Sequence, residues 1–246
     1  MKRFTLILLT VLSATACRQA TPEQQITKIS KYFGEQATEN YAENLRNHDA
    51  ARRVDYLTLT LAKELGAKDI WTLENAGENS LVAEFPGQER YVSRYSVLSA
   101  SLDDPDACAA VLQSLKACKD LKIKPKGSIH ALFYSPEKDT VQGTTGLGAF
   151  YQEITESGEM ITFEMEISSR DSLSHTIIIE DNAIFADQFI QVIPPYLAPM
   201  GSYQFRKGRY PNRNWPVKAT VYRYNIDPAD IRQESAVITA LTMLLN

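Results

Sequence analysis

The chain has 246 residues, a formal net charge of -4 and a pI of about 5.5, with 44% hydrophobic and 23% charged residues. This composition supplies a full hydrophobic core and excludes disordered, collagenous and low-complexity proteins. The small negative charge argues against a general nucleic-acid binder, which needs a basic surface to displace counterions from phosphate. No repeat or Gly/Ser linker divides the chain, so we expect a single domain over residues 17–246.

The first residues have the pattern of an export signal. Met1-Lys2-Arg3 is a positive start, Phe4 to Leu12 is apolar, and small residues at 13–16 lie directly before Cys17. The apolar run is too short to cross about 30 Å of hydrocarbon as a helix. The small residues before a cysteine resemble a bacterial lipoprotein cleavage site, although Ala14 replaces its usual leucine.

This resemblance implies that residues 1–16 are removed as a lipoprotein signal peptide and that Cys17 carries lipid. The protein is then expected in the bacterial cell envelope, anchored to a membrane by its lipid and facing the periplasm. The residue after the cysteine is Arg18 rather than the Asp that marks inner-membrane retention, which favours the outer membrane. A plain cleaved signal peptide is the alternative.

Helix and strand patterns alternate along the first half of the chain. Thr21-Pro22-Glu23-Gln24 has the hydroxyl, proline and glutamine of a helix start. A second apolar stripe ends at Gly66, where we expect a left-handed cap. Strands are predicted at 81–85 and 91–98, and Asp106 is the expected cap of the third helix.

That third helix contains Cys108 and Cys118, the two cysteines beyond Cys17. At 1.5 Å per residue they lie about 15 Å apart along the helix, too far for a disulfide. We expect both thiols in the core as small apolar side chains.

The second half begins with the segment 128–134, which is apolar at nearly every residue and typical of a central strand covered on both faces. It contains His130, which we expect to be a core residue, whereas His175 lies in a turn and is expected at the surface. The remaining predicted elements are a helix at 146–153, strands at 161–167 and 176–179, a helix at 182–193, a strand at 217–222 and a final helix from 227.

Strands that alternate with helices predict an α/β fold, specifically a three-layer αβα sandwich around a mostly parallel mixed sheet. Ligands of such sheets bind at the carboxyl ends of the strands. The residues that follow Leu98, Tyr134 and Phe163 are therefore the ones to examine for a site.

The region around these strand ends resembles a known enzyme family. The segments "KELGA", "VAEFPG", "YVSRYS" and "LDDPDACAAVLQSLKACKDLKIKPKGSIHALFYSPEKDTVQGTTGLGAFYQE" are similar, in that order, to the zinc aminopeptidases of the twenty-eighth metallopeptidase family, which also includes glutaminyl cyclases. The resemblance covers residues 50–170 well and the remainder loosely. It implies the zinc-exopeptidase fold, two zinc ions bridged by an Asp, and a Glu that deprotonates a metal-bound water.

Three of the family's functional positions have acidic counterparts in this chain. Asp103-Asp104 occupies the place of the bridging Asp, and Glu137 matches the general base. Another metal ligand comes from an Asp-Met step in a later strand, which is Glu164-Met165 here.

At the family's other ligand positions this chain does not have the residues that bind zinc. Lys138 replaces the second Glu of the family's Glu-Glu pair, and Arg94 of Ser93-Arg94-Tyr95-Ser96 stands where an Ala-His-Tyr-Asp motif has its histidine. No histidine occurs in Tyr222 to Asp227, where the last ligand is expected. A protonated lysine cannot bind a metal, and two zinc ions need about six protein donors.

We therefore expect a degenerate metal centre without zinc, in which Arg94 and Lys138 neutralise Asp103 and Glu164. The protein is interpreted as a non-catalytic binding or scaffolding protein whose pocket takes a peptide or another small anionic ligand, with Glu137 vestigial. The alternative is an active metallo-exopeptidase with a reduced or altered zinc site that keeps Asp103 and Glu164 as ligands.

A second candidate site is the stretch between Pro194 and Ile226, which has no acidic residue. The functional interpretation is a patch that binds an anionic ligand through arginine and aromatic stacking. The structural interpretation is a loop whose aromatic rings pack inward, and a third possibility is an envelope lipoprotein that presents this surface. The patch candidates are Arg206, Lys207, Arg209, Arg213 and Trp215.

Overall fold

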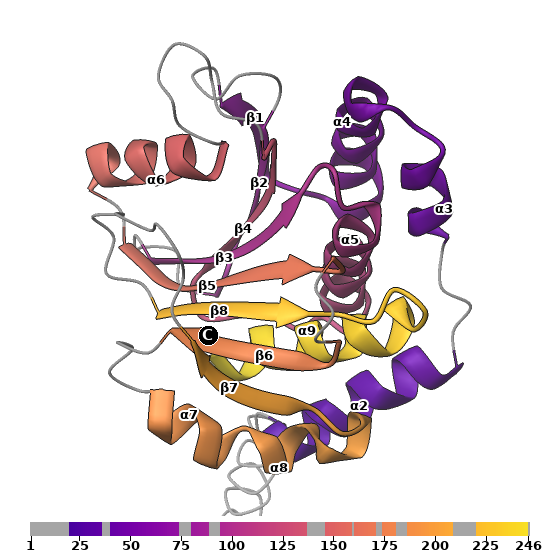
Figure 1. Ribbon diagram of the computed structural model, residues 1–246, viewed down its shortest axis with the longest axis vertical. Helices are drawn as coiled ribbons and strands as arrows, with labels where there is room; N and C mark the ends of the chain where they lie inside the picture. Colours follow the sequence, from indigo (N-terminus) through magenta and orange to yellow (C-terminus); the bar gives the residue numbers. More distant parts are fainter. Residues whose placement is uncertain are drawn as a thin grey trace, which may run out of the picture.

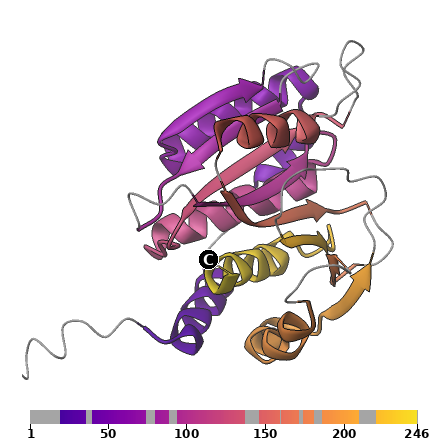
Figure 2. The same ribbon diagram turned by 90° about the vertical axis from the view of Figure 1, so that its left-hand side faces the viewer.

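The computed structural model describes residues 20–35, 40–73, 80–88, 94–136, 146–158, 160–170, 174–180, 186–208 and 220–245. These residues form an eight-stranded sheet in the order β1-β2-β4-β3-β5-β8-β6-β7, with helices on both faces (Figures 1 and 2). The predicted three-layer αβα sandwich with a mixed sheet is confirmed. The export signal lies outside the described residues, as do Cys17, Glu137, Lys138, Arg209, Arg213 and Trp215.

The middle of the sheet is parallel and its β1 side is antiparallel. Strand β3 runs parallel to β4 and β5, and β5 runs parallel to β8, whereas β1, β2 and β4 pair antiparallel. At the other edge β6 is antiparallel to β8 and parallel to β7. The strands are β1 (Asp69–Leu73), β2 (Ser80–Phe85), β3 (Arg94–Ser101), β4 (Ser128–Tyr134), β5 (Met160–Ser168), β6 (Thr176–Glu180), β7 (Gln204–Gly208) and β8 (Thr220–Asn225).

Several helix ends follow from local chemistry. Thr21 and Gln24 form the predicted capping box of α2, since each accepts the backbone N–H of the other. Gly66 ends the second helical segment with φ of 72°, as expected for a left-handed cap. The helical elements are α2 (Pro22–Glu35), α3 (Tyr41–Arg46), α4 (Ala50–Leu59), the π-helical turn η1 (Thr60–Leu65), α5 (Pro105–Asp120), α6 (Gly146–Ser157), α7 (Ala186–Val192), α8 (Pro194–Leu197), the 3-10 turn η2 (Ala198–Met200) and α9 (Ile231–Leu245).

The cap of α5 is Asp104 and not Asp106, so that prediction was wrong by two residues. Pro105 takes the first helical position, where its missing N–H is not needed, and the Asp104 side chain accepts the N–H of Ala107 at 3.1 Å. Asp106 lies within the first turn and pairs with Arg46 at 2.5 Å.

Successive residues of the central strands point to opposite faces and build two cores. On β3, Leu98 belongs to the larger core under α5 and α9, and Val97 belongs to the smaller core under α6. Cys108 and Cys118 are buried and unpaired in α5, as predicted. None of the described helices combines the length and apolar character needed to cross a bilayer.

Candidate functional site

The parallel strands β3, β4, β5 and β8 end at one edge of the sheet, and a cavity of about 550 Å³ opens there. Ser101 and Tyr134 are paired at the ends of β3 and β4, and Glu166 is paired with Arg223 across β5 and β8. The cavity's polar lining includes Ser101, Asp104, Tyr134, Glu166, Arg170 and Arg223. This is the edge at which an open parallel sheet is expected to bind ligands.

Glu166 is the centre of a charged cluster in this cavity. Arg223 Nη2 donates to Glu166 Oε1 at 2.9 Å, and the Tyr134 hydroxyl donates to the same oxygen at 3.0 Å. The side chain of Glu166 is 8% exposed and that of Arg223 is 35% exposed. Burial and the charge of Glu166 raise the pKa of Tyr134, so its hydroxyl stays protonated and remains a donor.

Asp104 lines the cavity and holds two neighbouring segments together through hydrogen bonds. Its carboxylate accepts the Ser169 N–H at 2.8 Å and the Ser169 hydroxyl at 2.5 Å, besides capping α5. Arg170, the residue after Ser169, donates its guanidinium to the backbone oxygen of Asp103. These contacts tie the loop after β3 to the loop after β5.

The predicted grouping of Arg94 with Asp103 is wrong. Arg94 is the first residue of β3, whereas Asp103 follows its last residue, Ser101. Seven steps along a strand span about 23 Å, which is beyond the reach of any ion pair. The strand was expected to end at Leu98, three residues too early, and this error moved the strand-end motif to the wrong edge of the sheet.

Glu164 also lies away from Asp103. It is paired with Val97 in the middle of β5 and is fully buried beneath α6. The Ser99 hydroxyl donates to it at 3.2 Å, and the Tyr151 hydroxyl donates to its other oxygen. Glu166, two residues later and on the same face, is the carboxylate that reaches the cavity.

The described part of the basic segment does not form one surface. Lys207 Nζ lies 2.5 Å from Asp187 of α7, and Arg206 donates to Gln204 on the exposed strand β7. Arg223 points instead to Glu166, and Tyr224 is fully buried. The burial of Tyr224 agrees with the structural interpretation, whereas Arg209, Arg213 and Trp215 lie outside the described residues and the patch stays a prediction.

Neither Glu166 nor Arg170 was predicted as a site residue, and Arg223 was included only as a residue of the stretch between Pro194 and Ile226. A signal for Glu166 was present, because it alternates with Glu164 along β5 and so shares its face. Choosing between the two required the true end of the strand.

Metal binding needs several donors that are free to converge. Among the described residues, no three His, Cys, Asp or Glu side chains are grouped so that they could hold a metal ion. Asp104 already accepts three hydrogen bonds and Glu166 accepts at least two, so the described lining does not fit the donor set of two zinc ions.

Solved structures share this architecture at low sequence identity. A Zn-dependent exopeptidase from Parabacteroides distasonis has a TM-score of 0.58 and 11% identity, over 88% of this chain and 97% of its own. A leucine aminopeptidase precursor from Bacteroides thetaiotaomicron has a TM-score of 0.54 and 12% identity, over 82% of this chain and 94% of its own. A peptidase M28 precursor from Shewanella amazonensis has a TM-score of 0.53 and 16% identity, over 68% of this chain and 44% of its own. The chain has the zinc-exopeptidase fold. No protein-family model matches it, and no curated protein does.

Proposed function

We propose that this protein is an exported, lipid-anchored relative of the zinc exopeptidases that binds a small ligand at the carboxyl edge of its sheet and does not hydrolyse peptides. The observation that carries the proposal is the cluster of Arg223, Glu166 and Tyr134 in that cavity. A guanidinium and a phenol satisfy the carboxylate that a metal would otherwise need.

The true end of β3 supports the loss of the metal ligands. The strand ends in Ser99-Ala100-Ser101, and none of these side chains can replace a histidine as a zinc ligand. The hypothesis of cations in place of metals is retained with different residues, since Arg223 takes the role that Arg94 was expected to have.

The ligand is expected to carry a carboxylate, as a peptide or an amino-acid-like molecule does. Arg170 is exposed and donates to an uncharged carbonyl oxygen, a contact that leaves its positive charge un-neutralised. Arginine binds carboxylates through paired N–H groups, and Arg170 and Arg223 both line the cavity.

The experiment compares trialanine with trialanine amide, using detergent-solubilised full-length protein and isothermal titration calorimetry. We expect the acid to bind more tightly than the amide, and Arg170→Gln to weaken the acid about tenfold with little effect on the amide. Arg52→Gln, an exposed arginine on α4, is the matched control for lost charge. Equal binding of acid and amide would contradict the proposal.

The alternative of an active metallo-exopeptidase is tested on the same protein. Elemental analysis of protein purified without chelator should find less than stoichiometric zinc, and leucine 4-nitroanilide should not be hydrolysed. Stoichiometric zinc with chelator-sensitive hydrolysis would establish the alternative. Hydrolysis that survives both chelation and Glu137→Gln would belong to a different chemistry.

The location of the protein rests on the sequence of its first residues. We propose a lipid on Cys17 that holds the domain at an envelope membrane, facing the periplasm. Cell fractionation tests this directly, because Cys17→Ser should release the protein from the membrane fraction, and continued membrane association of this variant would refute the lipid anchor.

A further inference from the structure

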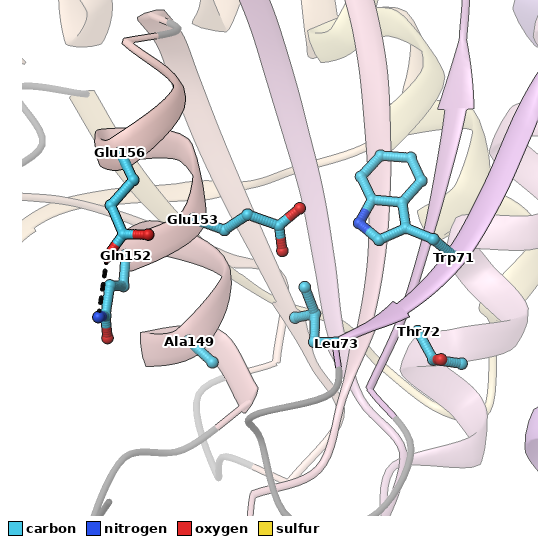
Figure 3. A pocket seen from close by; sticks show the side chains of 7 residues that line it. All are labelled: Trp71, Thr72, Leu73, Ala149, Gln152, Glu153 and Glu156. Carbon is cyan, nitrogen blue, oxygen red and sulfur yellow. Dashed lines mark hydrogen bonds between the residues drawn. The ribbon is translucent and has the colours of Figure 1, made fainter.

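An apolar cavity of about 280 Å³ lies at the end of the sheet opposite the carboxyl edge. It forms where β2 ends and β4 begins, since Phe85 of β2 is paired with Ile129 of β4 and both line it. Further apolar lining comes from Leu65, Leu115, Cys118 and Ile123. The cavity between β1 and α6 differs, because Gln152, Glu153 and Glu156 give it a polar wall (Figure 3).

Three lysines line the rim of the apolar cavity. Lys119 is in the last turn of α5, and Lys122 and Lys124 are in the loop that leads to β4. All three are exposed, and the described lining includes no aspartate or glutamate. Lys119 donates to the backbone oxygen of Glu64, an uncharged acceptor that leaves the ammonium charge un-neutralised. The cavity therefore combines an apolar interior with a positively charged rim.

Lys122 has a backbone conformation that lysine rarely adopts. Its φ is 56°, in the left-handed region, directly after the C-cap of α5. The Ile123 N–H donates to the Cys118 carbonyl oxygen at 2.8 Å. The Lys122 N–H donates to the Lys119 carbonyl oxygen at 3.1 Å, which completes a helix ending in which glycine is the usual residue at this position. Strain of this kind points to a function of the side chain, and the Lys122 side chain belongs to the charged rim.

This lining favours an amphiphilic anion. Apolar walls favour an alkyl chain, because its burial removes apolar surface from water. Ammonium groups at the rim favour a carboxylate or a phosphate. A neutral alkyl chain meets only the first condition, and a small hydrophilic anion meets only the second. The volume is just below the roughly 300–1,000 Å³ of small-molecule sites, so a single short chain fits best.

We propose that this cavity binds one short alkyl chain with an anionic head group, with the chain against Leu115 and Ile129 and the head group among the rim lysines. A fatty carboxylate and a monoalkyl phosphate share this chemistry. Ile129 and Tyr134, which lines the carboxyl-edge cavity, are five residues apart on β4, or about 17 Å along the strand. The proposal therefore does not depend on the function proposed for the carboxyl edge.

The test uses the full chain with Cys17→Ser in detergent-free buffer, so that neither an acyl chain nor detergent competes for the cavity. Octanoate and monooctyl phosphate are the probes and distinguish the two head groups. Acetate has the charge without the chain, and 1-octanol has the chain without the charge. Isothermal titration calorimetry should find saturable binding of at least one probe, with acetate and 1-octanol each binding at least about tenfold more weakly.

Isoleucine methyl groups labelled with 13C show where the probe binds. The signals of Ile123 and Ile129 should shift with the same midpoint as the calorimetric titration. The signal of Ile154, in the smaller core under α6, should not shift. Substitution of each of these isoleucines by valine assigns its signal.

Substitution of the rim lysines separates charge from packing. Lys122→Gly removes one charge and suits the left-handed conformation, so the variant should fold. Combined with Lys124→Gln, it should weaken the bound probe at least about tenfold and leave 1-octanol unchanged. Arg52→Gln, at an exposed position on α4, is the matched control for lost charge and should change neither affinity. If the double variant does not fold, Lys122→Asn takes its place, because asparagine also adopts this conformation, and should weaken the probe about threefold.

The proposal is overturned if neither probe binds more tightly than both acetate and 1-octanol, or if a bound probe leaves the signals of Ile123 and Ile129 in place. It is also overturned if the folded lysine variant keeps the affinity of its parent.

Discussion

His130 is buried in β4 among the rings of Trp71, Tyr95 and Phe150, at centroid distances of 5.5, 4.1 and 6.1 Å. Burial, with a smaller contribution from the charge of Lys68, lowers the pKa of His130 to about 4 from 6.5. Its Nδ1 atom has no hydrogen-bond partner among the described groups. The expectation of a core histidine is confirmed, and the residue is a neutral ring at physiological pH.

This environment makes His130 a source of acid sensitivity. In the unfolded chain the imidazole takes up a proton near pH 6.5, but in the folded protein only near pH 4, so stability falls as the pH falls through this window. The free energy of unfolding of His130→Phe should fall by up to about 3 kcal/mol less than that of the parent as the pH is lowered. At pH 8 the two proteins should have nearly the same free energy of unfolding. Urea unfolding at pH 8, 6, 5 and 4 measures it, and an unchanged pH slope in the variant would contradict the assignment.

At the scale of single elements, helix α5 begins at a carboxylate that joins three segments. Asp104 accepts the N–H of Ala107 in α5 and both polar groups of Ser169 after β5, and it is 2% exposed. Its neighbour Asp103 is exposed. The two adjacent aspartates therefore contribute differently to the free energy of unfolding, although they form one motif in the sequence.

We expect Asp104→Ala to lower the free energy of unfolding by about 2–3 kcal/mol, since it removes a helix cap and leaves buried donors without an acceptor. Asp103→Ala is the matched control and should change it by less than about 0.5 kcal/mol. Chemical denaturation of both variants decides the matter. Equal effects of the two substitutions would contradict this difference between Asp103 and Asp104.

Element boundaries also explain which parts of the site could be predicted. Capping chemistry is local, so the ends of α2 at Thr21 and of the second helical segment at Gly66 were predicted correctly. The end of β3 has no such signal, because its last residues are small and neutral, and the predicted end at Leu98 misplaced Arg94. Glu166 and Arg223 meet only through the pairing of β5 with β8, which the chain order does not reveal.

At the scale of the whole molecule, the parallel centre was predicted because helices alternate with strands, but the strand order was not. The pairing of β8 between β5 and β6 is a long-range choice that the chain order does not reveal. That choice brings His175, expected in a surface turn, against the buried carboxylate of Glu234 on α9. His175 Nδ1 lies 2.6 Å from Glu234 Oε1, and its Nε2 lies 3.6 Å from Asp227.

This cluster connects β6, β8 and α9. Glu234 is fully buried, accepts the N–H of Asp227 at 3.0 Å and accepts the hydroxyl of Tyr224. Burial raises the pKa of Glu234 to about 7 from 4.5, against the opposing effects of the Asp227 N–H and His175. The folded protein therefore holds a proton on this carboxyl that the unfolded chain has already lost.

The consequence is a pH dependence opposite in sign to that of His130. The unfolded chain releases the Glu234 proton near pH 4.5, whereas the folded protein holds it until about pH 7. The contribution of Glu234 to stability is therefore fully present below pH 4.5 and is lost as the pH rises through 7. Glu234→Gln cannot ionise. Its amide oxygen can still accept the N–H of Asp227, and its amide NH2 can donate to the Tyr224 hydroxyl oxygen. Its stability should therefore lose the downward slope between pH 4.5 and 7, which urea unfolding across that range measures against the exposed control Glu35→Gln. A slope that survives in Glu234→Gln would mean that a different group holds the proton, and the cluster would then serve only to join the β6–β7 edge to the rest of the fold.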